Sequence, residues 1–278
     1  MQNFEIKNKL LSQENKKEIK TLWQNNFCDD SEEIINNFLD NVLKSEKGVG
    51  AFLNNELVAM ILFLSSKIII ENKEIKSVYF YAVCTDEKYR KKGIIRTLFS
   101  FATEEARKQG YKMSFLVPQN EELFKMYEKL SFERTINYEE KYIEKRDCDN
   151  KNTITQKTDF CYDDYIRIKL NSPNKQQFVV WEKDEFEFIF NKTREDISFI
   201  FTDLSFAVYE KNNTEILVYE ICGDEKEITS LLFNNHIDCK KIILRLPTEK
   251  NKTDFGMTLN LSDREYKISS LYFGMPYG

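Results

Sequence analysis

The sequence has a single histidine, His236, among its 278 residues. A Ser-His-Asp triad needs a histidine beside its nucleophile, and zinc sites are usually built from several histidine and cysteine ligands. No C-x-x-C pair occurs either, since the six cysteines lie far apart along the chain. We therefore expect no metal site and no histidine-based hydrolase, and we interpret the cysteines as reduced thiols packed like small hydrophobic residues.

The chain also lacks any run of 18 apolar residues, the length that marks a membrane span, and it lacks a charged-then-apolar leader. Its most apolar stretch, residues 57–70, is interrupted by Ser65, Ser66 and Lys67. We expect neither a membrane span nor a signal peptide, and a cytoplasmic location by default. The formal net charge is −5 and no broad basic stripe occurs, which argues against nucleic acid as a partner.

The composition is that of a globular protein, with 41% hydrophobic and 14% aromatic residues. Residues 145–159 are polar and offer almost nothing to bury, so we place a domain boundary there. The sequence thus predicts a first domain over residues 1–145 and a second over residues 155–278.

Hydrophobic periodicity predicts alternating strands and helices in the first domain. Helices are expected over 13–25, 31–44, 94–109 and 120–130, and strands over 3–11, 57–64, 75–85, 112–117 and 132–142. The unit from 75 to 117 implies a parallel crossover. A strand–strand–helix–strand run over 206–210, 215–221, 225–233 and 241–246 repeats this order, which suggests a degenerate internal duplication without a phosphate signature in its second copy.

Residues 86–98 read DEKYRKKGIIRTL, so that five cationic side chains surround Gly93 where a helix begins. The start of a helix exposes unpaired N–H groups and disfavours nearby cations by about 0.3–1 kcal/mol each. A helix whose first turn happens to be basic would have to carry that cost. A bound anion removes it, so we interpret the segment as a site for a small anionic ligand such as a pyrophosphate.

This segment resembles the acyl-CoA signature of the GCN5-related N-acetyltransferases (GNAT), R/Q-x-x-G-x-G/A on a strand-to-helix turn. Here it reads Arg90-Lys91-Lys92-Gly93-Ile94-Ile95, with Ile95 in the last position. A two-domain subgroup, the enhanced intracellular survival-type acetyltransferases, is similar in tolerating an aliphatic residue there. The resemblance implies a mixed α/β (α+β) fold, with a GNAT N-terminal domain and a second, degenerate GNAT-like domain that lacks the CoA signature.

Residues 114–135 are similar to a second GNAT segment, which ends in a Y-x-x-x-G-F-like element. Here Tyr127 and Phe132 match, and Ser131 replaces the usual glycine. The resemblance implies that Tyr127 is the general acid that protonates the CoA thiolate, and that Asn120 binds near the pantetheine. Without the family, Leu123 and Leu130 at helical spacing favour a core tyrosine, and its place in the whole pattern reverses that preference.

The resemblance further implies direct transfer from acetyl-CoA to an amine. Its cofactor-binding set would be Ala82, Val83, Cys84, Thr85, Arg90, Lys91, Lys92, Gly93, Ile94, Ile95, Arg96 and Asn120. A base must deprotonate the amine, and the sequence offers Glu74, Asp86, Glu87, or water-linked Tyr79 and Tyr81. In the family a C-terminal carboxylate can also reach the site, which makes Gly278 a further candidate.

Two readings of function remain open. The first is an acetyl-CoA-dependent N-acetyltransferase for a small-molecule or peptide amine. The alternative is a non-catalytic acyl-CoA-binding or regulatory protein. A nucleotide-binding module is disfavoured because no G-x-x-x-x-G-K-[ST] run occurs. Acidic pairs such as Asp29-Asp30 are interpreted as solvated faces, and a homo-oligomer is left open.

Overall fold

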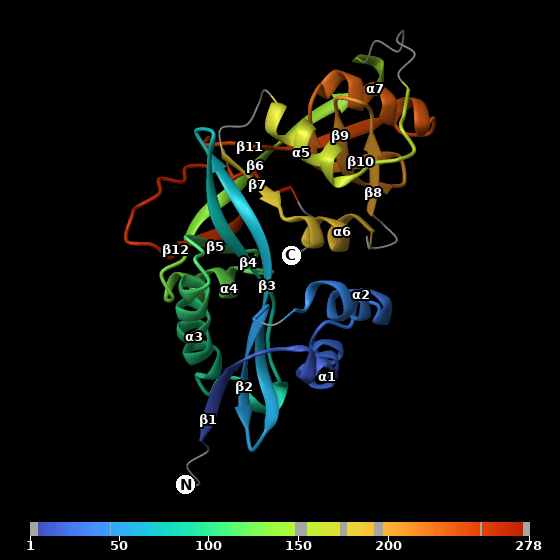
Figure 1. Ribbon diagram of the computed structural model, residues 1–278. Coiled ribbons are helices and arrows are strands. Elements are labelled where there is room, and N and C mark those ends of the chain that lie inside the picture. Colours follow the sequence, from blue (N-terminus) through green and yellow to red (C-terminus); the bar gives the residue numbers. More distant parts are fainter. Residues whose placement is uncertain are drawn as a thin grey trace.

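The computed structural model describes residues 5–44, 46–147, 155–172, 177–191, 197–250 and 252–274. We call residues 5–147 the first half and residues 155–274 the second half. Figure 1 shows them as two lobes, connected by the long hairpin of strands β3 and β4 that rises from the first lobe toward the second.

Twelve strands in the described part of the chain form one mixed sheet, in the order β1-β2-β3-β4-β5-β12-β6-β11-β10-β9-β8, with β7 paired to β3. The strands are β1 (Ile6–Leu10), β2 (Gly48–Leu53), β3 (Glu56–Ile70), β4 (Lys73–Thr85), β5 (Met113–Leu116), β6 (Glu133–Glu144), β7 (Gln177–Trp181), β8 (Ile197–Phe201), β9 (Phe206–Asn212), β10 (Glu215–Cys222), β11 (Lys241–Pro247) and β12 (Thr253–Asn260). The predicted mixed α/β class is confirmed.

The helices follow local sequence signals. They are α1 (Lys16–Asn26), α2 (Glu32–Asn37) with a π turn (Phe38–Val42), α3 (Ile94–Lys108), α4 (Glu121–Glu128), α5 (Tyr162–Asn171), α6 (Lys183–Asn191) and α7 (Glu225–Asn235), with short 3₁₀ turns at Gln13–Asn15, Glu87–Tyr89 and Lys145–Asp147. Ser31 caps α2 by accepting the N–H of Ile34, as its residue type predicts. Gly110 follows α3 with a φ of 84°, which confirms it as the glycine that ends the helix. No helix among the described residues is long and apolar enough to cross a membrane.

Strands from the end of the chain complete the sheet of the first half. Strand β12 lies between β5 and β6 and is antiparallel to both, while β6 continues outward to pair with β11. Strand β7 pairs with the outer part of β3. One large hydrophobic core therefore includes Phe99 of α3, Phe186 of α6 and Met257 of β12, and a smaller second core surrounds α7. The domain division at residues 145–155 stays a prediction, but the two halves share a sheet and a core.

The second half repeats the topology of the first. Strands β9 and β10 form an antiparallel hairpin, α7 follows, and β11 pairs parallel to β10. In the first half β3, β4, α3 and β5 have the same relation, with β4 and β5 parallel. The register shifts in both hairpins, between Met60 and Leu62 on β3 and between Val218 and Glu220 on β10. The shared order and the shared bulge support the predicted internal duplication.

Candidate active site

The cavity opens where two parallel strands separate. Strands β4 and β5 pair only over Ser77–Tyr79 and Met113–Phe115, after which β4 runs on to Thr85 while β5 ends at Leu116. A cavity of about 280 Å³ lies at this separation. Its lining comes from β4, from the end of β5, from α4 and from the loop after α1: Asn26, Phe27, Cys28, Asp29, Asp30, Tyr79, Phe80, Tyr81, Ala82, Val83, Leu116, Val117, Gln119, Leu123 and Tyr127.

A bulge in β4 turns its backbone toward this cavity. Met60 pairs with Cys84 and Leu62 with Tyr81, so Ala82 and Val83 together face the single residue Ile61. Ala82 has a φ of 47°, which a non-glycine residue adopts only when its surroundings hold it there. Such a bulge frees backbone groups from the β3 ladder, and both bulge residues line the cavity.

Cys84 and Thr85, also predicted to bind the cofactor, rejoin the ladder with β3 beyond the bulge. Burial raises the pKa of the Cys84 thiol to about 12, so it stays protonated and unreactive near neutral pH. The carbonyl of Thr85 accepts a hydrogen bond from Arg90 Nε at 3.1 Å. Neither residue lines the cavity.

The loop before α3 presents a row of unbonded amides. Lys91 and Gly93 both have positive φ, 62° and 77°, so the chain curls and its N–H groups converge. Within the described part of the chain, the amides of residues 91–95 donate to no other group. The first turn of α3 carries no acidic residue and no side-chain cap, and a Cβ on Gly93 would meet nothing within 4 Å. These features together make a cradle for an anion.

The side chains of this loop have different surroundings from its amides. Lys91, Lys92 and Arg96 are exposed, and the Lys92 ammonium lies 5.1 Å from the Tyr89 ring centroid. Ile94 is buried, and Ile95 is half-buried and packs against the core. The bulky Ile95, which departs from the usual signature, therefore has a place for its side chain in the protein interior.

Tyr127 lies on α4 at the wall of the cavity and is only 5% exposed. Its ring packs edge-on against Phe99 and Phe132, with centroid distances of 5.4 and 5.8 Å. Burial raises the pKa of its hydroxyl well above the ordinary value, because the phenolate would lose its hydration. The hydroxyl has no hydrogen-bond partner in the described part of the chain, so a protonated donor lies at the cavity wall.

Comparison with known families decides what this arrangement is. Residues 7–135 match the family model described as an acetyltransferase (GNAT) domain. The first half is a GNAT domain. The prediction of a GNAT acetyltransferase is thereby confirmed, although the chain matches no curated protein closely enough to be counted as a relative.

Solved structures extend the likeness beyond the GNAT domain. A GCN5-related N-acetyltransferase from Kribbella flavida is 13% identical with a TM-score of 0.70, and the match covers 92% of this chain and 71% of that one. Eis1 from Mycobacterium abscessus is 10% identical with a TM-score of 0.69, covering 92% and 74%. The Saccharomyces cerevisiae N-myristoyltransferase with bound myristoyl-CoA is 12% identical with a TM-score of 0.55, covering 92% and 79%. At such identities the likeness shows the fold, which spans both halves.

Asn120 caps helix α4, and its predicted binding near the pantetheine stays a prediction. Its side-chain oxygen accepts the N–H of Leu123 at 3.0 Å, which caps α4. The neighbouring Gln119, and not Asn120, lines the cavity. The sequence could not distinguish the two, because an asparagine before a helix suits a cap and a ligand contact equally.

The loop after α1 forms part of the cavity wall and was missed from the sequence. Asn26 to Asp30 line it, although Asp29-Asp30 was interpreted as a solvated pair. Asp30 Oδ2 accepts a hydrogen bond from the indole N–H of the fully buried Trp23 at 2.7 Å. No local pattern marks this loop, since its role comes from the packing of α1 against β3 and β4.

The predicted bases divide into two groups. Glu74 pairs with Lys67 near the β3–β4 turn, Asp86 accepts the N–H of Lys88, and Glu87 is exposed, so none of these carboxylates lines the cavity. Tyr79 and Tyr81 do line it. Gly278 lies outside the described residues, so its role as a base stays a prediction.

In the second half, side chains of the protein already bind the amides at the start of α7, the position that corresponds to the anion cradle. Asp224 caps α7 by accepting the N–H groups of Lys226 and Glu227, so these amides are already used. A Cβ on Gly223 would lie 2.4 Å from both the Leu204 carbonyl and Ser205 Oγ, so a larger residue does not fit at this position.

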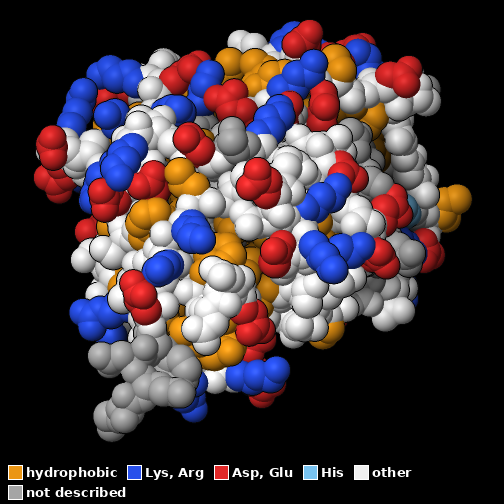
Figure 2. Space-filling view, turned by 60° about the horizontal axis from the view of Figure 1, so that its bottom comes forward, with side chains coloured by type: hydrophobic (Ala, Val, Ile, Leu, Met, Phe, Trp, Pro, Cys, Tyr) orange, Lys and Arg blue, Asp and Glu red, His pale blue; other side chains and the backbone are white. Residues whose placement is uncertain are grey.

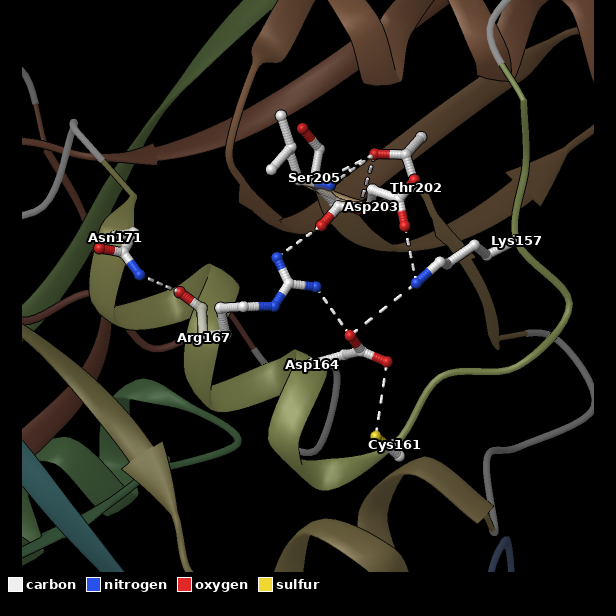
Figure 3. Close-up of polar contacts among 9 residues, drawn as sticks. Lys157, Cys161, Asp164, Arg167, Asn171, Thr202, Asp203 and Ser205 are labelled. Carbon is white, nitrogen blue, oxygen red and sulfur yellow. Dashed lines mark hydrogen bonds and ion pairs between the residues drawn. The ribbon is translucent and has the colours of Figure 1, made fainter.

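Two nearby cations in the second half, Arg167 and Lys157, are paired within the protein. Figure 3 shows Arg167 donating to Asp164 and to the Asp203 carbonyl, while Lys157 lies between the carboxylates of Asp164 and Asp203. The amides of residues 223, 224, 226 and 227 already donate to side chains of the protein, so the second half lacks the row of unbonded amides that makes the first-half loop an anion cradle.

Proposed function

We propose that the chain is an acetyl-CoA-dependent N-acetyltransferase that acetylates a primary amine. The observation that carries this proposal is the row of unbonded amides at residues 91–95, open to solvent at Gly93 and adjacent to a strand that leads into the cavity. These amides would hold the pyrophosphate of CoA, and the bulge at Ala82 and Val83 would offer backbone groups to the pantetheine as a sheet edge does to an added strand.

The reaction then needs a donor and an acceptor of protons. The neutral amine nitrogen attacks the thioester carbonyl, and a backbone N–H of the bulge is suited to stabilise the oxyanion. As the tetrahedral intermediate collapses, the C–S bond breaks and Tyr127 donates its proton to the thiolate. The nitrogen loses its extra proton to a base, through water or directly. The raised pKa of Tyr127 suits this role, because the hydroxyl is protonated at neutral pH.

The loop of residues 26–30, which we call the acceptor wall of the cavity, supports an amine as the substrate. Asp29 and Asp30 place negative charge at the cavity wall, and an amine with a pKa near 10.4 arrives as an ammonium ion. Elsewhere, acidic and basic side chains are interspersed over the face shown in Figure 2. That mixture supports a small ligand or a single amino group over an extended polyanion as the substrate.

Calorimetric titration with acetyl-CoA tests the first step, and a thiol-release assay over a panel of amines tests turnover. Tyr127→Phe should lower kcat by about 10²-fold or more, the usual contribution of a general acid, and leave the acetyl-CoA affinity within about twofold. The wild-type rate should rise with pH as the amine deprotonates. Below about pH 10 the rate should not fall through deprotonation of Tyr127, since burial raises the pKa of Tyr127.

Tyr142→Phe is the matched control, because Tyr142 is a 57% exposed tyrosine on β6 away from the cavity lining. It should leave both quantities unchanged. An unchanged rate in Tyr127→Phe removes Tyr127 from its role. Binding without turnover on any amine favours the non-catalytic acyl-CoA-binding alternative, and absence of binding rejects both.

A further inference from the structure

Arg90 connects the two walls of the site. Its Nη2 donates to Asn26 Oδ1 at 2.8 Å, and its Nε donates to the Thr85 carbonyl at 3.1 Å. The Asn26 amide is itself oriented, because its Nδ2 donates to the Leu22 carbonyl inside α1 at 2.9 Å. Asn26 Oδ1 is therefore held toward the guanidinium across a separation of 64 residues in sequence.

This pairing differs from that of Arg134 and Arg167. Arg134 binds three carboxylates and Arg167 binds Asp164, whereas Arg90 has no carboxylate partner in the described part of the chain. Its two hydrogen bonds go to neutral oxygens on separate elements, the end of β4 and the end of α1. A guanidinium can bond both at once because its donors form a fixed fork, which a lysine ammonium does not reproduce.

The elements joined in this way have distinct roles. Arg90 directly precedes the amides of residues 91–95, and Asn26 begins the loop 26–30 that lines the acceptor side of the cavity. Trp23, one turn before Asn26 on α1, donates to Asp30 at the other end of that loop. A continuous set of contacts thus runs from the anion cradle through Arg90 and Asn26 to the acidic acceptor wall.

We propose that Arg90 is a positioning residue that couples occupancy of the 91–95 cradle to the arrangement of the acceptor loop 26–30, so that acyl-CoA bound first sets the amine-binding wall. The inference rests on the proposed function in taking CoA as the ligand of the cradle. An anion that fixes the backbone of residues 91–95 also fixes the start of the Arg90 side chain. The guanidinium, bonded to the Thr85 carbonyl and to Asn26, then holds Asn26 in place. Coupling between sites through such contacts typically amounts to fivefold or more in an equilibrium.

Trp23 offers a reporter for the acceptor loop, since the chain has only two tryptophans and the substitution Trp181→Phe removes the emission of the second. In a Trp181→Phe background, coenzyme A should change the emission of Trp23. It should also slow hydrogen exchange over residues 24–34 by about fivefold or more. In Asn26→Ala, calorimetry should show coenzyme A bound with an affinity within about threefold, while both responses are lost. Arg90→Lys should lose both responses as well. The double variant should behave like either single variant, because the two changes remove one interaction.

Arg107→Lys is the control, because Arg107 Nε also donates to a neutral carbonyl, that of Leu261, away from the cavity lining. It should keep both responses. Should Arg90→Lys lose coenzyme A altogether, Asn26→Ala decides, since Asn26 lies outside the cradle. Coenzyme A that binds without any response in the parent, or with an unchanged response in both variants, overturns the coupling. Failure of coenzyme A to bind the parent protein instead rejects the proposed function.

Discussion

Single residues show where this chain departs from its family pattern and what the departure costs. Ser131 stands where the Y-x-x-x-G-F element usually has glycine, and it adopts a φ of 68°. The position closes the end of α4, where the Ser131 N–H donates to the Glu128 carbonyl and the Phe132 N–H donates to the Tyr127 carbonyl. A left-handed conformation costs a side-chain-bearing residue about 1–2 kcal/mol, so the turn that supports Tyr127 is strained.

Ser131→Gly should therefore raise the free energy of unfolding by about 0.5–1 kcal/mol. Glycine removes the Cβ penalty, and part of that gain is offset by the greater freedom of the unfolded chain. Urea denaturation measures the change. Ser100→Gly, at an exposed position inside α3, is the matched control and should lower stability by about 0.5 kcal/mol. If both substitutions changed the free energy of unfolding in the same direction, this account of Ser131 would be contradicted.

The sequence predicted which residues belong to the site better than it predicted where their side chains point. Gly93 and Tyr127 could be named because a helix start and a family element mark them. The orientation of Arg90 toward Asn26 could not, because it depends on where α1 lies against β4. Asp30 was interpreted as solvated for the same reason, since only the packed indole of Trp23 shows that its carboxylate belongs to the cavity wall.

At the scale of elements, the two equivalent helices α3 and α7 begin in opposite ways. Both starts have a positive-φ glycine, but the α3 start has free amides and no acid, whereas the α7 start has Asp224 on its amides and acids in its first turn. In the second half the Asp224 carboxylate accepts the amides at the start of the helix, whereas in the first half the equivalent amides are left for a ligand. The duplicated topology is therefore compatible with a single anion site per chain.

Replacing Gly93 by valine tests that site. Valine should weaken coenzyme A binding by about tenfold or more, because its side chain occupies the open space before the helix and strains a φ of 77°. Gly110→Val carries the same strain at a φ of 84°, with no atom nearer to its Cβ than Lys76 Nζ at 4.0 Å. Both variants should lose similar stability in denaturation, yet only Gly93→Val should lose affinity in calorimetry. Equal affinities would mean that the pyrophosphate lies elsewhere.

Elements with a strong local signal were predicted, and those that depend on distant partners were not. Helix α3 has a buried stripe of Ile94, Leu98, Ala102 and Ala106, so its bounds were predicted almost to the residue. Strands β7, β8 and β12 and helix α5 went unrecognised. Strand β12 contains Gly256 and has mixed burial, and its pairing partners stand more than 100 residues away in sequence, so no local periodicity announces it.

For the molecule as a whole, β12 makes the first half dependent on the second. It lies between β5 and β6, and its residue Met257 is completely buried. Without β12, both neighbouring strands would have unpaired edges in the middle of the sheet and the core beneath them would be open to water. The polar stretch between the halves suggested a domain boundary, which stays a prediction, and the sheet topology shows that the two halves share one sheet.

We therefore expect residues 1–147 alone to lack a cooperative unfolding transition and to bind no coenzyme A, although this segment contains the whole family signature. The full chain should unfold with its two halves together, because they share a core. Near-ultraviolet circular dichroism during heating measures the transition, and calorimetry measures binding. Fusing residues 252–262 to the segment through a Gly/Ser linker restores the missing strand and should recover part of both properties. A cooperative transition and full affinity in residues 1–147 alone would show that β12 is dispensable, and the second half would then be an appendage and not a structural part of the active site.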